Sequence, residues 1–200
     1  MNFVIIDYGA GNVINVANAF KKIGVVCSVS KNESKWKNAD ALVLPGVGSF
    51  GAAMRDLSER STPLKNILTE DGIPFLGICL GMQILMDESE ESSGVSGLGV
   101  IGGKAKRFST HLPVPQIGWN EVLIKPTPLF EGVENFFAYF VHSYYCEPDD
   151  KKWISSTTEY GLRFASAFTN KNVFATQFHP EKSGEVGLRI LENFVKEVKR

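Results

Sequence analysis

The residues with the clearest chemical potential are Cys79 and two glycines, Gly77 and Gly81, that stand two positions to either side of it. An apolar run from Phe75 to Ile78 leads into this cysteine. Gly-x-Cys-x-Gly after a strand is the cysteine version of a nucleophile elbow, a sharp strand-to-helix turn that exposes one nucleophile above a sheet. The glycines are needed because the turn crowds the backbone. We expect a helix over residues 80–86, whose first N–H groups favour the reactive thiolate.

A cysteine nucleophile also needs a base, and the chain has three histidines: His111, His142 and His179. His179 ends a β-like run, and Glu181 follows two residues later. The proline between them fixes the backbone, so both side chains can point the same way and the carboxylate can orient the imidazole. Cys79, His179 and Glu181 therefore form a candidate triad. An inert buried cysteine and a structural histidine remain the alternatives for the two residues taken alone.

Attack on a carbonyl produces an oxyanion, which needs N–H donors. The backbone N–H of Leu80, directly after the cysteine, is one candidate. The Pro45-Gly46-Val47-Gly48 loop follows an apolar run and can present a second main-chain donor. A plain turn explains the same four residues equally well.

Composition excludes several other classes of function. The net charge of −1 and a pI near 6.3 give no field for nucleic acid or anionic membrane. Three widely spaced cysteines, Cys27, Cys79 and Cys146, match no zinc or disulfide framework. We expect no metal and no cofactor. Met1 runs directly into a short apolar stretch ended by Asp7, which is no signal peptide, so we expect a cytoplasmic protein with reduced thiols.

The order of the predicted elements indicates an α/β fold in one domain, residues 1–200. The first half alternates short buried strands with amphipathic helices, which predicts a mainly parallel open sheet flanked by helices. The second half holds β-like runs separated by turns, which predicts an antiparallel β extension, and a helix closes the chain. An acidic, serine-rich surface segment over 87–93 separates the halves. The predicted strands are 3–6, 25–29, 41–44, 73–78, 99–101, 105–108, 120–124, 136–141, 153–157, 165–169 and 173–178, and the main helices are 13–23, 50–60, 63–70, 80–86 and 185–199.

Taken together, these motifs resemble the class I glutamine amidotransferases. The shared stretches are Pro45–Gly48, Gly77–Gln83 and Gln177–Glu181. Asp7–Asn12, Ile117–Glu121, Tyr139–Tyr144 and Lys182–Ser183 are similar to the glutaminase subunits of imidazole glycerol phosphate synthase. The similarity covers nearly the whole chain in order.

The resemblance implies that Cys79 attacks the side-chain amide of L-glutamine, with Val47, Gly48 and Leu80 at the oxyanion. His179, oriented by Glu181, protonates the leaving ammonia and then activates water against the thioester. It further implies that the substrate's α-amino and carboxylate groups are held by Gly46, Gln83, Glu91, Ser143 and Tyr144.

The resemblance also implies a partner. Ammonia passes to a HisF-like cyclase, a (β/α)8 barrel that makes imidazole glycerol phosphate and an aminoimidazole carboxamide ribotide in histidine biosynthesis. The family further implies a heterodimer and a glutaminase that is activated allosterically, with a main-chain flip in the glycine loop as a route. Partner-interface or channel positions match Asn12, Asn15, Trp119, Tyr139 and Lys182.

One departure leaves the pathway open. The family commonly has histidine before the Gly-Trp-Asn stretch, whereas this chain has Gln116. A paralogue that supplies ammonia to a sugar-modifying synthase in surface-glycan biosynthesis is therefore the second candidate. A subunit with a vestigial triad and a cysteine peptidase of related fold are further alternatives.

Overall fold

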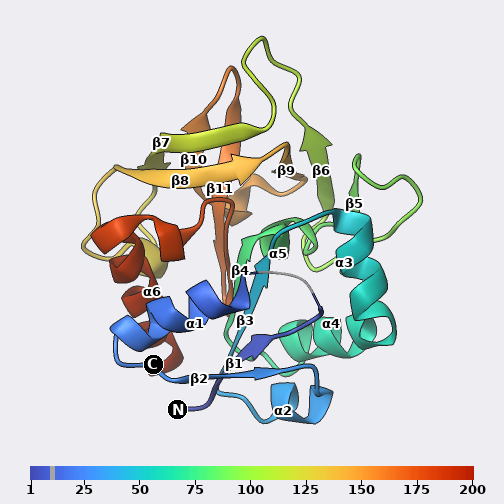
Figure 1. Cartoon of the computed structure of the whole chain (residues 1–200), viewed down its shortest axis with the longest axis vertical. Helices are drawn as coiled ribbons and strands as arrows, with labels where there is room; N and C mark the ends of the chain where they lie inside the picture. Colours follow the sequence, from blue (N-terminus) through green and yellow to red (C-terminus); the bar gives the residue numbers. More distant parts are fainter. Residues whose placement is uncertain (10–11) are drawn as a thin grey trace.

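A continuous β-sheet runs the length of the molecule, as the computed structural model of residues 1–9 and 12–200 shows (Figure 1). Its lower half is parallel, with the strand order β2-β1-β3-β4-β12. These strands are β1 (Phe3–Ile6), β2 (Cys27–Ser30), β3 (Ala41–Gly46), β4 (Phe75–Cys79) and β12 (Val173–Thr176).

The upper half of the sheet is largely antiparallel and continues from β12 through β11, β10, β7 and β8. A side branch joins β9 to β11, then β6 to β9 and the short β5 to β6. The predicted fold, a mainly parallel open sheet with an antiparallel extension, is confirmed. These strands are β5 (Glu88–Ser89), β6 (Gly103–Arg107), β7 (Gln116–Ile124), β8 (Phe136–His142), β9 (Tyr144–Pro148), β10 (Ile154–Glu159) and β11 (Arg163–Asn170).

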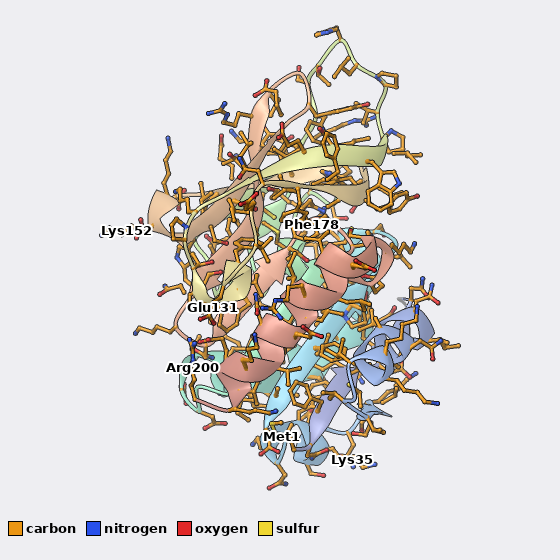
Figure 2. All side chains as sticks on the ribbon, turned by 90° about the vertical axis from the view of Figure 1, so that its left-hand side faces the viewer. Met1, Lys35, Glu131, Lys152, Phe178 and Arg200 are labelled. Atoms are coloured by element: carbon orange, nitrogen blue, oxygen red, sulfur yellow. The ribbon has the colours of Figure 1, made fainter. Side chains whose placement is uncertain are left out.

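Helices cover both faces of the parallel half, because its strands other than the edge strand β2 are buried on both faces. Phe3 and Ile5 pack with α1 (Val13–Lys22) and α6 (Gly184–Val198), whereas the alternate residues Val4 and Ile6 pack on the opposite side. That second side is covered by α2 (Glu33–Lys37), α3 (Phe50–Leu57) and α4 (Ser61–Thr69). Figure 2 shows α6 lying along one face of the molecule. Charged side chains, such as those of Lys35 and Lys152, are directed outward.

Three predicted elements need correction. Residues 99–101 are no strand: Gly99 has φ +58°, and the N–H groups of Val100 and Ile101 both donate to the Leu85 carbonyl. The helix after the cysteine is one turn, α5 (Leu80–Gln83), after which the chain continues as tight turns. The segment 87–93 is not wholly a surface segment, because it contains β5 and the buried Ser89.

Some boundaries and one strand also differ from prediction. β9 was not predicted, and β7 begins four residues before the predicted strand. α3 is followed by a 3₁₀ turn (Ser58–Arg60), and further 3₁₀ turns span Pro128–Phe130, Lys151–Trp153 and Pro180–Lys182. Ala10 and Gly11, part of the Asp7–Asn12 motif, lie outside the described residues.

The turn that follows β4 depends on close backbone contact with β3. A Cβ atom at Gly77 would lie 2.6 Å from the Gly81 carbonyl oxygen, and one at Gly81 would overlap the carbonyl oxygen of Leu44. Backbone atoms at such distances cannot give way as a flexible side chain can. The steric reason predicted for the flanking glycines is thus confirmed.

We therefore expect Gly81→Ala to lower the free energy of unfolding by about 3 kcal/mol, because the new methyl group overpacks a rigid junction. Gly102→Ala is the matched control, since its Cβ would meet side chains rather than backbone: the Asp149 carboxylate at 3.2 Å and the Asp87 carboxylate at 3.8 Å. Urea unfolding of both variants is the measurement. A Gly81→Ala protein as stable as the control would contradict the proposed crowding.

The antiparallel half has a small aromatic core around a buried histidine. His142 lies 5.2–5.6 Å, between ring centroids, from Phe108, Phe140 and Phe164. Its Nδ1 lies 2.7 Å from the Tyr144 carbonyl oxygen and therefore carries the proton. Burial lowers the pKa of His142 from 6.5 to about 4; the bond to Tyr144 opposes this shift and the nearby His179 adds to it.

This shift predicts acid sensitivity. Between pH 6.5 and about 4 the unfolded chain binds a proton that the folded chain excludes. The free energy of unfolding should then fall by up to roughly 3 kcal/mol as the pH drops through this window. His142→Phe should flatten that part of the slope, whereas substitution of the exposed His111 by Gln should leave it. Urea unfolding at about pH 4.5 and about pH 7 tests this, and equal slopes in all three proteins would refute it.

Candidate active site

The carboxyl ends of three adjacent strands bring the candidate site together. Gly46 pairs with Cys79 between β3 and β4, and Ile78 pairs with Thr176 between β4 and β12. The glycine loop, the elbow and the segment that carries His179 therefore leave the sheet at one edge. This is the edge at which open parallel sheets place their ligand sites.

Cys79 has the strained backbone of a nucleophile elbow. Its φ and ψ angles are 55° and −105°, a region that residues with a side chain rarely adopt, and the residue is 6% exposed. Such strain costs on the order of 1–3 kcal/mol and persists only where the surrounding structure imposes it. Here the close approach of β3 and α5 imposes it.

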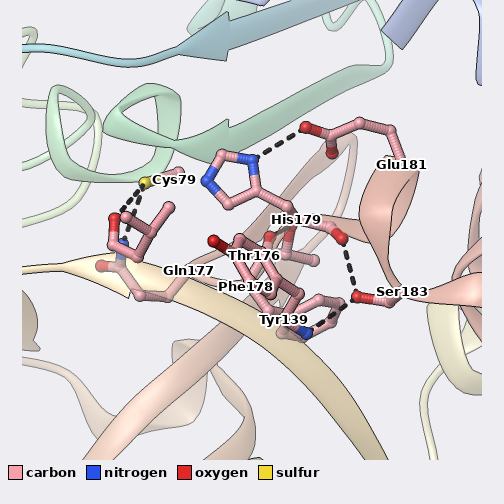
Figure 3. A network of polar contacts seen from close by, with 9 residues as sticks. Cys79, Tyr139, Thr176, Gln177, Phe178, His179, Glu181 and Ser183 are labelled. Carbon is pink, nitrogen blue, oxygen red and sulfur yellow. Dashed lines mark hydrogen bonds and ion pairs between the residues drawn. The ribbon is translucent and has the colours of Figure 1, made fainter. Parts of the chain in front are cut away.

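The candidate base, His179, is held through both its side chain and its backbone. His179 Nδ1 lies 2.8 Å from the Glu181 carboxylate, and both side chains are at most 2% exposed. Ser183 Oγ donates to the His179 carbonyl oxygen at 2.7 Å, and the His179 N–H donates to Tyr139. Figure 3 shows the imidazole ring between Cys79 and Glu181.

These contacts set the state of the imidazole. A proton on Nδ1 satisfies the carboxylate and leaves the Nε2 lone pair toward Cys79. Nε2 has no hydrogen-bond partner among the described residues. Burial lowers the pKa of His179, but Cys79 and the Glu181 carboxylate together raise it by more than burial lowers it, so the net shift is upward. The histidine is thus suited to hold a proton taken from the thiol.

The single-turn α5 changes the expected source of thiolate stabilisation. A macrodipole grows with aligned peptides, and four residues align few of them. Local donors must therefore supply more of the stabilisation. One is visible: Gln177 Nε2 donates to Cys79 Sγ at 3.5 Å.

A cavity of about 240 Å³ opens beside the sulfur. It is partly enclosed and holds polar groups from distant segments of the chain, as expected for a small-molecule site. The lining residues are Val47, Gly48, Cys79, Leu80, Gln83, Glu91, Pro115, Val141, His142, Ser143 and Tyr144.

Nearly all residues predicted to hold substrate or oxyanion line this cavity. Gly46 is the exception: it lies beneath the elbow, where a Cβ would stand 2.5 Å from Leu80 Cβ. The Phe50 N–H donates to Glu91 Oε2 at 2.6 Å. Glu91 is therefore held in place by the protein and does not simply point into solvent with the other acidic residues of its segment. The Ser143 carbonyl is already bonded to the Phe108 N–H, at 3.0 Å.

The residues predicted for the partner interface do not line this cavity, and three of them cluster beside His179. The Tyr139 ring is 6.4 Å from both the His179 and Trp119 rings, and Lys182 Nζ lies 5.4 Å from its centroid. Trp119 is 57% exposed, which is unusual for so large an apolar side chain.

Asn12 and Asn15 stand at the start of α1. Asn15 borders an open hollow of about 700 Å³ that also includes Glu181 but not Cys79.

Sequence reasoning missed two buried polar residues at this site, Gln177 and His142. His142 was considered only as a base, yet it donates a hydrogen bond to Tyr144. Gln177 was noted only as part of a shared motif. Its contact with sulfur follows from the β4–β12 register, which no local sequence signal reveals.

The remaining cysteines are unsuited to nucleophilic chemistry. Burial raises the pKa of Cys27 to about 12, and burial, with a smaller effect of Cys79, raises that of Cys146. Over residues 1–9 and 12–200, His, Cys, Asp and Glu form no group of three or more able to hold a metal ion. None of the helices in the described part of the chain is long and apolar enough to cross a membrane.

Comparison with known proteins identifies the family of this chain. Residues 4–198 match the family model described as "Glutamine amidotransferase class-I". A solved structure described as a glutamine amidotransferase superposes with a TM-score of 0.79 at 18% identity, covering 98% of this chain and 99% of that one. At that identity the likeness speaks for the fold.

Curated relatives are much closer in sequence. Imidazole glycerol phosphate synthase subunit HisH from Methanothermobacter thermautotrophicus is 51% identical over 193 residues, which is 96% of each chain. Its counterpart from Methanocaldococcus jannaschii is 48% identical and covers 96% of this chain and 97% of that one. The chain belongs to the class I glutamine amidotransferases and, within them, to the HisH subunits of imidazole glycerol phosphate synthase.

Proposed function

We propose that this protein, as one glutaminase domain over residues 1–200, hydrolyses L-glutamine to L-glutamate and ammonia through Cys79, His179 and Glu181. The observation that carries the proposal is the strained cysteine facing a histidine whose far nitrogen is bonded to a buried carboxylate. The relationship to HisH subunits supplies the substrate and the pathway, histidine biosynthesis.

In the proposed reaction, His179 takes the thiol proton and Cys79 attacks the side-chain amide carbon of glutamine. The Leu80 N–H and the main chain of Val47 and Gly48 stabilise the oxyanion. His179 returns the proton to the departing ammonia, leaving a glutamyl thioester. It then activates water, which releases glutamate and restores the thiol.

Substrate recognition is proposed for the far end of the cavity. Glu91 supplies a negative charge for the α-ammonium group, and its second carboxylate oxygen is not used by Phe50. Gln83, Ser143 and Tyr144 present amide and main-chain groups for the remaining polar atoms of the substrate. Gly46 contributes indirectly, because it allows the elbow to sit close to β3.

We propose a HisF-like cyclase barrel as the partner in a cytoplasmic heterodimer. Asn12, Asn15, Trp119, Tyr139 and Lys182 form the docking face and the start of the ammonia path. Allosteric activation is proposed to act through the loop around Gly48, whose φ of +111° is open to glycine but strained for other residues.

The surface-glycan paralogue remains the second candidate on one observation, Gln116. Gln116 is 2% exposed and stands opposite His142 in the β7–β8 register, so it is buried and adds nothing to an exposed docking face. Co-purification with either a cyclase barrel or a sugar-modifying synthase distinguishes the two.

The central test measures glutamate release from glutamine with and without a HisF-like barrel. Wild type should be stimulated by the barrel, and Cys79→Ala should release none. His179→Ala should lose about 100-fold or more, because it removes the acid and base. Glu181→Gln should lose less, because it removes only the orienting group.

Glu192→Gln is the matched control on α6, where the exposed carboxylate pairs with Arg189. With an ammonium salt as nitrogen donor, the Cys79→Ala complex should still form imidazole glycerol phosphate. Glutamine-dependent synthesis by Cys79→Ala would exclude the proposed mechanism and favour a vestigial triad. Hydrolysis of peptides in place of glutamine would favour a peptidase.

A second experiment addresses the docking face. Trp119→Ala should weaken binding to the barrel by about 100-fold, because exposed tryptophans that become buried are frequent binding hot spots. Val26→Ala is the control, since Val26 is 80% exposed and precedes the edge strand β2 at the far end of the sheet. Calorimetric titration gives both affinities, and equal losses for the two variants would remove Trp119 from the interface.

A further inference from the structure

Gln177 is a fully buried side chain that joins the elbow to the wall of the cavity. Its exposed fraction is 0%, and it is not among the residues that line the cavity. Its Nε2 lies 3.5 Å from Cys79 Sγ, and its Oε1 accepts from Gln83 Nε2 at 3.3 Å. Gln83 Nε2 also donates to the Tyr144 carbonyl oxygen, at 3.1 Å. A continuous chain of hydrogen bonds therefore runs from Tyr144 to the sulfur.

The direction of this chain is fixed at its Tyr144 end. A main-chain carbonyl can only accept, so Gln83 must present its NH₂ group there. The same NH₂ group also contacts the side chain of Gln177, so Gln177 must accept this hydrogen bond through its carbonyl oxygen. Gln177 is then obliged to turn its own NH₂ group toward the sulfur. The orientation of this amide thus follows from the contacts and does not depend on telling nitrogen from oxygen.

The Tyr144 carbonyl is itself held in place. His142 Nδ1 lies 2.7 Å from the same oxygen, so the two donors occupy both lone pairs. The backbone of Gln177 is fixed as well, because its N–H donates to the Ser166 carbonyl at 2.9 Å. Both ends of the chain are therefore rigid.

The sulfur has need of such a donor. The Val141 carbonyl, 4.0 Å from Sγ, can accept from a thiol but faces a thiolate unfavourably. The α5 helix is one turn, and His179 Nε2 makes no hydrogen bond within the described residues. In the proposed mechanism the protonated His179 faces the thiolate, and a side-chain N–H close to the sulfur adds a second donor that does not depend on that proton.

We propose that Gln177 is a catalytic residue whose Nε2–H group donates to the Cys79 sulfur and stabilises the thiolate, while Gln83 and Tyr144 set its orientation. The inference deepens the proposed function, on which it rests for the nucleophilic role of Cys79. Because Gln177 contacts the reacting sulfur and does not line the cavity, it should affect turnover more than substrate binding.

The test measures the rate at which iodoacetamide alkylates Cys79 across pH, with each cysteine peptide resolved by mass spectrometry. Gln177→Met keeps the shape of the side chain and removes the donor. Its alkylation midpoint should move up by about one pH unit, which is about a tenfold loss of rate below the midpoint. Gln177→Glu should show a larger loss, because a carboxylate oxygen then faces the sulfur.

Gln116→Met is the matched control, because Gln116 is a second buried glutamine, 2% exposed, outside this hydrogen-bond chain. Its alkylation profile should match that of wild type. Circular dichroism and urea unfolding identify any variant that does not fold. One folded Gln177 variant is enough to test the inference. With the HisF-like barrel present, kcat should fall about tenfold in Gln177→Met while the KM for glutamine changes little.

Coincident alkylation profiles for wild type and a folded Gln177 variant would overturn the inference, as would a shift of equal size in Gln116→Met. The readout does not require glutamine to be the substrate. A shifted profile without glutamine hydrolysis would therefore uphold the thiolate donor and reject the proposed function. Glutamine hydrolysis by wild type together with an unshifted alkylation profile in the Gln177 variants would uphold the proposed function and reject the thiolate donor.

Discussion

The site depends on how closely two backbones approach where β4 ends. The carbonyl of Leu44 occupies the space that a side chain at position 81 would need, and Gly81 leaves that space free. This contact draws the turn after Cys79 down onto β3 and forces the cysteine to a positive φ. The sulfur is thereby raised above the strand ends, between the glycine loop and the segment after β12. Sheet register alone would have aligned the three segments without exposing the nucleophile.

Near that contact, buried side chains determine where the proton of the imidazole lies and which groups face the sulfur. Glu181 fixes the proton on the far side of the imidazole, so the near nitrogen is available to the thiol. Gln177 faces the sulfur from another direction. Each of these side chains makes at least one hydrogen bond that fixes its orientation, whereas His179 Nε2 and Glu181 Oε2 have no partner among the described residues. Preorganisation here comes from side chains of low exposure rather than from a long helix dipole.

The parallel half was predicted well because four of its strands, β1, β3, β4 and β12, are buried on both faces and read as largely apolar runs. The elbow and the His179–Glu181 pair were predicted for local reasons, namely steric crowding and a rigid proline. The antiparallel half was harder. β9 carries Cys146 amid polar residues and ends in Pro148, a residue that seldom continues a strand.

Apart from the pairing of Cys79 with His179, contacts between distant segments could not be predicted from the residues themselves. Gln83 and Glu91 came only from the family resemblance, since nothing local links an acidic segment to the start of α3. The role of Gln177 depends on which strand lies beside β4. A glutamine has no chemical signature until that neighbour is known.

The position of β12 also bears on how the protein is made. This strand is central in the sheet, between β4 and β11, yet it is formed by residues 173–176 of a 200-residue chain. During synthesis the edge of β4 must wait for nearly the whole chain to leave the ribosome, and closing so long a loop is slow. Until then Cys79 also lacks its proposed base, because His179 arrives on the same segment. Insertion of this strand thus completes the sheet and assembles the proposed triad in one event, so we expect a chain that ends before β12 to release no ammonia.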